Sequence, residues 1–175
     1  MAAWDRAYVQ VYTGDGKGKT TAALGLALRA VGAGLRVFIA QFAKGMPSSE
    51  LVSLERLADL VTVRQYGLGG FVRGSPTPAD VAAAREGLAE VREAVASGRW
   101  DVVILDEANI ATHFGLFSVE ELLEVVDLAG GRVEIVVTGR RADPRLLARA
   151  DLVTEMREVK HYFAKGVPAR RGIES

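Results

Sequence analysis

Short runs of mostly apolar residues alternate with longer amphipathic stretches along this chain. The apolar runs are typical of strands buried in a parallel sheet, and they cover residues 7–12, 35–42, 61–66, 101–107 and 132–138, with a candidate edge strand at 152–156. Apolar positions at helical spacing fill the stretches between them, at residues 18–32, 48–59, 77–98, 118–130 and 143–150. Strands that alternate with helices predict one α/β domain over residues 1–175, built on a parallel sheet.

Capping residues set the expected ends of several helices. Residues 77–80 read Thr-Pro-Ala-Asp, a typical helix start, and residues 118–121 form a capping box. A serine at position 48 or 49 is expected to cap the second helix. Gly32 or Gly34 and, later, Gly98 are expected to end helices in a left-handed conformation.

Two segments lack any periodic pattern. Residues 67–76 contain four glycines and are predicted to form a mobile loop. Phe71 lies in this loop, either as an anchor for a small apolar cluster or as an aromatic lid. The tail, residues 157–175, mixes charged residues with two glycines and one proline, and we expect it to be irregular.

Composition excludes several classes of function. The 22 basic and 22 acidic residues cancel, so the chain lacks the basic surface of a nucleic-acid binder. The absence of cysteine excludes disulfides, thiolate metal sites and a cysteine nucleophile. The sequence shows neither a signal peptide nor an apolar run near the ~20 residues that span a bilayer. We therefore expect a soluble, cytoplasmic protein with no membrane partner.

The most informative stretch joins the first strand to the first helix. Its sequence indicates a phosphate-binding P-loop, with a candidate nucleotide-binding set of Gly14, Asp15, Gly16, Lys17, Gly18, Lys19, Thr20 and Thr21. Glycines let backbone N–H groups turn inward, and the helix N-terminus adds donors and a positive dipole end. Lys19 supplies a point charge, and the Thr20 hydroxyl is a candidate Mg²⁺ ligand. The loop departs from the common pattern at Thr13, where a glycine is expected, and Lys17 adds a second cation.

A second signal is the apolar strand that ends in Asp106 and Glu107. In P-loop proteins such a strand, expected beside the first one, places an acid near Mg²⁺. Asp106 is therefore a candidate metal contact through water. Glu107 is a candidate second cation ligand or a base that activates water. The alternative is a strand with acidic residues at its exposed end.

Weaker candidates lie elsewhere in the chain. Arg140 follows a strand at the carboxyl edge of the sheet, where ligands of open α/β sheets bind, and it either contacts a phosphate or is solvated. His113 and His161 lie far apart in sequence, form no evident metal pair and are expected to be structural. These residues predict a Mg²⁺-dependent nucleotide binder without identifying the group that reacts with the nucleotide.

Beyond these patterns, the chain resembles the ATP:corrinoid adenosyltransferases, the enzymes of cob(I)yrinic acid a,c-diamide and cob(I)alamin. The resemblance rests on the loop glycines and on motifs spread over the chain, at residues 12–21, 41–45, 50, 70–71, 105–107, 137–140, 159–169 and 172–174. It implies a RecA-like P-loop fold, a mostly parallel sheet with helices on both faces. It also implies an unusual reaction, in which Co(I) of a reduced corrinoid attacks C5′ of ATP and tripolyphosphate leaves.

The resemblance also implies roles for individual residues. Lys19 and Thr20, with Lys17 and Mg²⁺ or Mn²⁺, stabilise the leaving group, and Glu107 becomes a cation ligand or a structural acid, not a base that activates water. Phe71 faces the corrinoid and helps to displace the lower cobalt ligand. Arg73 stands where some members have tryptophan, which indicates a different corrinoid preference. The implied partners are a reductase that supplies electrons and a second copy of the chain in a homodimer.

Two other functions fit the same loop. One is an ordinary ATPase or small-molecule kinase, which releases phosphate or ADP instead of tripolyphosphate. The other is a nucleotide-dependent module that binds corrinoid without turnover.

Overall fold

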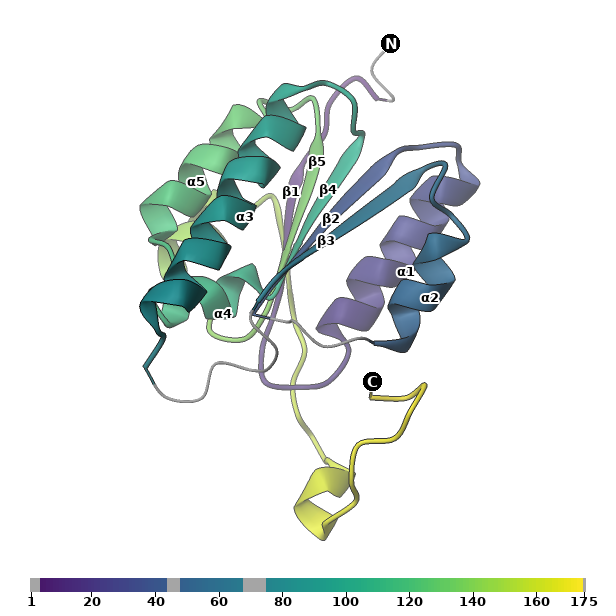
Figure 1. The fold of residues 1–175 in the computed structure, drawn as a ribbon, viewed down its shortest axis with the longest axis vertical. Helices are drawn as coiled ribbons and strands as arrows, with labels where there is room; N and C mark the ends of the chain where they lie inside the picture. The colour runs from purple at the N-terminus through teal and green to yellow at the C-terminus, as the bar shows by residue number, and fades with distance from the viewer. Residues whose placement is uncertain (1–3, 44–47, 68–74, 175) are drawn as a thin grey trace.

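A parallel sheet lies at the centre of the molecule (Figure 1). The fold is that of a computed structural model, which describes residues 4–43, 48–67 and 75–174. Within these residues the sheet has six strands in the order β3-β2-β4-β5-β1-β6, and every pair is parallel. The strands are β1 Val9–Thr13, β2 Val37–Phe42, β3 Val61–Tyr66, β4 Val102–Asp106, β5 Glu134–Thr138 and β6 Leu152–Glu155.

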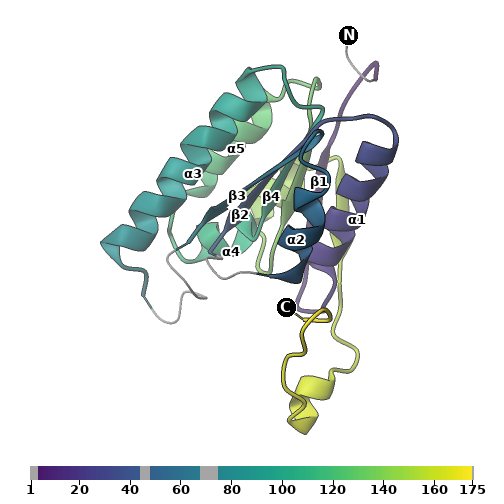
Figure 2. The ribbon, with the colours of Figure 1, turned by 45° about the vertical axis from the view of Figure 1, so that its right-hand side comes forward.

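Helices cover both faces of the sheet, as Figures 1 and 2 show. On one face, α1 (Lys19–Gly32) and α2 (Ser49–Glu55) pack through small and aliphatic side chains onto β2, β3 and β4. The other face carries α3 (Pro78–Ala96), α4 (Ala108–His113), α5 (Val119–Leu128) and α6 (Pro144–Arg149) over a larger apolar core. The predicted α/β class, with a parallel sheet between two helical layers, is confirmed. Among the described helices, none is long and apolar enough to cross a bilayer.

The position of the acid-ended strand differs from the sequence prediction. We expected it beside β1, but β5 lies between β1 and β4 and pairs with both. These strands are all short runs rich in apolar residues, so their side-chain patterns do not specify which strand neighbours which. The carboxyl ends of β1 and β4 still reach the same edge of the sheet.

Helix ends follow the capping signals closely. Thr77 with Asp80 and Ser118 with Glu121 both form complete capping boxes, while the glycines at 34 and 98 are left-handed, with φ of 80° and 64°. The second helix differs: it ends at Glu55 instead of about residue 59, and the buried Ser48 hydroxyl makes no hydrogen bond to its first turn. The sequence analysis also missed α4.

After β6 the chain leaves the domain and turns back toward α1 (Figures 1 and 2). It is irregular, as predicted, except for a short 3₁₀ helix, Tyr162–Lys165. The carbonyl of Ile173 accepts a hydrogen bond from Lys17 Nζ at 3.0 Å. The end of the tail therefore lies against the glycine-rich loop.

Two helical glycines offer a matched test of the packing. A Cβ at Gly87 would lie 2.4 Å from Tyr66 Cγ, whereas a Cβ at Gly25 meets nothing within 4 Å. Alanine is favoured over glycine inside a helix by about 1 kcal/mol, so Gly25→Ala should stabilise the fold. Gly87→Ala should destabilise it by about 1–3 kcal/mol, because overpacking outweighs the helix preference. Urea unfolding measures both, and equal stabilisation would contradict this packing.

Candidate functional site

The loop between β1 and α1 has the geometry of an anion site. Gly18, with φ of 124°, is the N-cap of α1, and no side chain caps the helix or places an acid in its first turn. Free backbone N–H groups and the positive end of the helix dipole are therefore available to a bound phosphate. Lys19 Nζ donates to the carbonyl oxygens of Gly14 and Gly16, both at 2.7 Å. Burial, partly offset by Glu107, lowers the pKa of Lys19.

The loop glycines are required by a close backbone neighbour. A Cβ at Gly14 would lie 2.4 Å from the carbonyl oxygen of Met156, and one at Gly16 would lie 2.8 Å from the same atom. Gly16 N donates to this oxygen at 2.7 Å. Thr13, where a glycine was expected, still belongs to β1 and pairs with Glu155 of β6. The glycines thus lie where the loop crosses the end of β6.

The acid that ends β4 is buried among hydrogen-bond donors. Asp106 is 1% exposed. Its Oδ1 accepts from Thr20 Oγ1 at 2.8 Å and from Thr138 Oγ1 at 2.6 Å, while its Oδ2 accepts from Gln41 Nε2 at 3.2 Å. The structure thus joins Thr20 and Asp106, two residues that the sequence analysis proposed as metal contacts. It adds Gln41 and Thr138, which the sequence analysis assigned to no site.

Glu107 follows Asp106 in a strained backbone conformation. Its φ is 60°, in the left-handed region that residues other than glycine rarely adopt. Its backbone N–H donates to Thr138 Oγ1 at 3.0 Å. Both acids line the same cavity, but Asp106 is almost fully buried and held by hydrogen bonds from three side chains. Strain of this kind is often found at functional sites.

That cavity, here called the P-loop cavity, has a volume of about 970 Å³. It includes most of the predicted site residues; those that line it are Gly16, Lys17, Gly18, Lys19, Thr20, Thr21, Asp106, Glu107 and Arg140. Gly14 contributes its carbonyl to Lys19, and Asp15 is exposed outside the lining. Phe71 and Arg73 lie outside the described residues.

Other walls of the P-loop cavity were not predicted. Helix α2 contributes Ser49, Glu50 and Ser53, and the tail contributes His161 and residues 172–174. His161 was expected to be structural, and it does accept a hydrogen bond from Phe163 N, at 3.0 Å, while also facing the cavity. Several of these residues belong to the stretches that carry the family resemblance, but the sequence did not show that they meet the loop, because only the fold brings them together.

The donor set fits a magnesium ion that is shared with phosphates. Within the described part of the chain, no group of three or more His, Asp or Glu side chains could hold a metal by itself. Mg²⁺ usually takes one or two carboxylates or hydroxyls and completes its octahedron with substrate phosphates and water. Thr20 and Glu107, which line the same cavity, can supply ligands of this kind.

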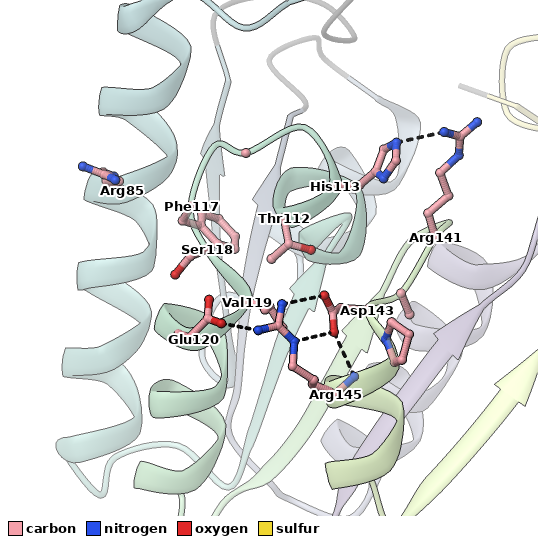
Figure 3. A pocket seen from close by; sticks show the side chains of 13 residues that line it. Arg85, Thr112, His113, Phe117, Ser118, Val119, Glu120, Arg141, Asp143 and Arg145 are labelled. Atoms are coloured by element: carbon pink, nitrogen blue, oxygen red, sulfur yellow. Dashed lines mark hydrogen bonds and ion pairs between the residues drawn. The ribbon is translucent and has the colours of Figure 1, made fainter.

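A second cavity, of about 670 Å³, lies beside the end of α4 and the start of α5 (Figure 3). Arg145 pairs there with Asp143, at 2.9 Å, and with Glu120, while Arg141 Nη1 lies 2.8 Å from His113 Nε2. None of the predicted phosphate-binding residues lines this cavity. We therefore assign nucleotide chemistry to the P-loop cavity.

The packing of the loop on β6 can be tested at Gly16. Gly16→Ala forces the loop away from Met156, and overpacking of this type costs about 1–3 kcal/mol. ATP affinity should therefore fall by roughly tenfold or more, as measured by isothermal titration calorimetry. Gly25→Ala, in open space on α1, is the control and should bind ATP as the unmodified chain does. Unchanged affinity in Gly16→Ala would show that this contact does not shape the loop.

Comparison with known proteins identifies the family. The model of the ATP:corrinoid adenosyltransferase family BtuR/CobO/CobP matches residues 5–175. The corrinoid adenosyltransferase of Pseudomonas aeruginosa is 34% identical over 171 residues, 97% of this chain and 84% of that relative. The corrinoid adenosyltransferase of Escherichia coli K12 and the corrinoid adenosyltransferase CobA of Salmonella typhimurium are each 36% identical, over 97% of this chain and 86% of each relative. The chain therefore belongs to the ATP:corrinoid adenosyltransferase family.

Proposed function

We propose that this chain transfers the 5′-deoxyadenosyl group of ATP to Co(I) of a reduced corrinoid, in adenosylcobalamin biosynthesis or salvage. Family membership over almost the whole chain carries the proposal. The P-loop cavity supports it, because it joins a helix N-terminus, two lysines and a hydroxyl–carboxylate pair. These groups suit a substrate with three phosphates.

In the proposed reaction the cobalt electron pair attacks C5′ of the ribose. A cobalt–carbon bond forms, the bond from C5′ to the triphosphate oxygen breaks, and its electrons leave on tripolyphosphate. Cobalt changes formally from Co(I) to Co(III). Co(I) is already a strong nucleophile, so no general base is needed. The tasks left to the protein are to position C5′ and to stabilise the charge that develops on the leaving group.

The residues of the P-loop cavity suit these two tasks. Lys19 and Lys17 place positive charge beside the phosphates, and the first turn of α1 adds backbone donors. Thr20 donates its proton to Asp106, at 2.8 Å, so its oxygen lone pairs remain for Mg²⁺ or Mn²⁺. A bound divalent ion would supply further positive charge to the leaving group. We assign Glu107 to the cation and Arg140 to a phosphate.

The corrinoid side of the site remains a prediction from the resemblance. Phe71 would help to displace the lower cobalt ligand, and Arg73 would alter the corrinoid preference. An electronic spectrum of Co(II) corrinoid bound with ATP would detect four-coordinate cobalt. The proposal further includes a reductase that supplies electrons, a homodimer, and a reducing, ATP-supplied compartment, which we infer to be the cytoplasm.

The products of the reaction distinguish this function from its competitors. Incubation with ATP, Mg²⁺ and a chemically reduced corrinoid should yield a light-sensitive adenosyl-corrinoid and one equivalent of tripolyphosphate. An ATPase or kinase would instead release phosphate or ADP, and a non-catalytic module would bind ATP without turnover. Absence of adenosyl product from all corrinoids supplied in the Co(I) state would refute the proposal.

The contribution of Lys19 can be measured directly. Loss of one preorganised charge-stabilising donor typically lowers kcat by about 10²–10³-fold, and we expect a loss of this size for Lys19→Ala. Lys165→Ala is the control, because this lysine lies in the exposed 3₁₀ helix of the tail and not in the cavity lining. Full adenosyl transfer by Lys19→Ala would exclude any mechanism that uses the P-loop.

A further inference from the structure

We propose that Gln41 is a positioning residue for the magnesium–triphosphate site, acting through Asp106 and Thr20, and that Gln65 positions Gln41 in turn. The inference rests on the proposed function only in taking Mg²⁺–ATP as the ligand of the P-loop cavity. Neither glutamine lines that cavity. Their effect must therefore pass through other side chains.

Gln41 is a polar residue in a strand that is buried along its whole length. All six residues of β2 are buried, and the other five are apolar: Val37, Phe38, Ile39, Ala40 and Phe42. Gln41 itself is 0% exposed. Burying an amide is costly unless its donors and acceptor find partners. A glutamine at this position is therefore stable only with the hydrogen bonds that it makes.

Those hydrogen bonds run along one row of the sheet. Gln41 is the register partner of Gln65 on β3 and of Asp106 on β4. Gln65 Nε2 donates to Gln41 Oε1 at 3.0 Å, and Gln41 Nε2 donates to Asp106 Oδ2 at 3.2 Å. Thr138 of β5 extends the row with its hydrogen bond to Asp106 Oδ1. Four neighbouring strands thus contribute to one polar row at the carboxyl edge of the sheet.

The carboxylate fixes the direction of this chain of amides. An ionised Asp106 only accepts hydrogen bonds, so Gln41 must turn its amide nitrogen toward it. The Gln41 oxygen then faces Gln65, which must in turn present its own nitrogen. Both amides thus direct donors toward Asp106 and stabilise its negative charge in a site that water scarcely reaches.

The orientation of Asp106 controls the orientation of Thr20. With Oδ2 held by Gln41, Oδ1 is turned toward the hydroxyls of Thr20 and Thr138. The Thr20 hydroxyl then donates its proton to Asp106, and the lone pairs of the Thr20 oxygen remain for the cation. Loss of the Gln41 hydrogen bond would free the carboxylate to rotate, and the hydroxyl of Thr20 would lose its fixed direction. Outer-shell partners of metal ligands act in this way.

The test measures ATP binding with and without a divalent ion, and it needs no corrinoid. Loss of an outer-shell partner lowers metal affinity by about 10–100-fold. In Gln41→Leu we expect a decrease of this size in Mn²⁺ affinity for the ATP-bound protein, read from the electron paramagnetic resonance signal of free Mn²⁺. Affinity for metal-free ATP, measured by calorimetry, should change less than threefold. Gln65→Leu should give a smaller decrease of the same kind.

Gln10→Leu is the matched control. Gln10 also makes two side-chain hydrogen bonds within the sheet, to Glu134 at 2.6 Å and from Tyr12 at 2.7 Å, but it contacts neither Asp106 nor Thr20. Its Mn²⁺ affinity should match that of the unmodified chain.

Three results would overturn the inference. They are unchanged Mn²⁺ affinity in folded Gln41→Leu, an equal loss of metal-free and metal-bound ATP affinity, or a decrease of the same size in Gln10→Leu. If Gln41→Leu fails to fold, the test relies on Gln65→Leu, at the half-buried end of the row. Unchanged Mn²⁺ affinity in that variant would then overturn the inference.

A chain that shows the expected binding but forms no adenosyl-corrinoid would refute the proposed function and leave this inference standing.

Discussion

The buried negative charge of Asp106 is the constraint on which the site depends. A carboxylate that is 1% exposed is stable only when donors surround it. The donors come from α1, β2 and β5, so the charge links three elements that are separated in sequence. The hydroxyl of Thr20 is oriented by the same contacts. Stability of the sheet edge and geometry of the cation site therefore share one set of hydrogen bonds.

Much of the fold could be predicted from the sequence because its signals are local. Capping boxes at residues 77–80 and 118–121 and the apolar runs located most elements within a few residues. The order of the strands could not be predicted in this way. The runs of β1, β4 and β5 are alike in being short and rich in apolar residues, and such runs do not indicate which strand lies beside which.

The candidate site also contains residues that local sequence signals identify and residues that only the fold brings in. Lys19, Thr20 and Glu107 lie within motifs that have a recognisable spacing, and the structure brings them to one cavity. Gln41 and Thr138 each occupy a single position in an apolar strand, and only the register of the sheet joins them to Asp106. The short helix α4 was missed because its six residues are too few for a periodic pattern.

The contact between Gly16 and Met156 has a consequence for the order of folding. These residues are 140 positions apart, so the glycine-rich loop is supported by backbone that follows β6, far along the chain. Contacts of such long range form late, because the chain between them must be ordered first. A nascent chain that ends before β6 would hold the whole phosphate-binding motif without the backbone on which it rests. Nucleotide binding therefore becomes possible only after the residues that follow β6 have been synthesised.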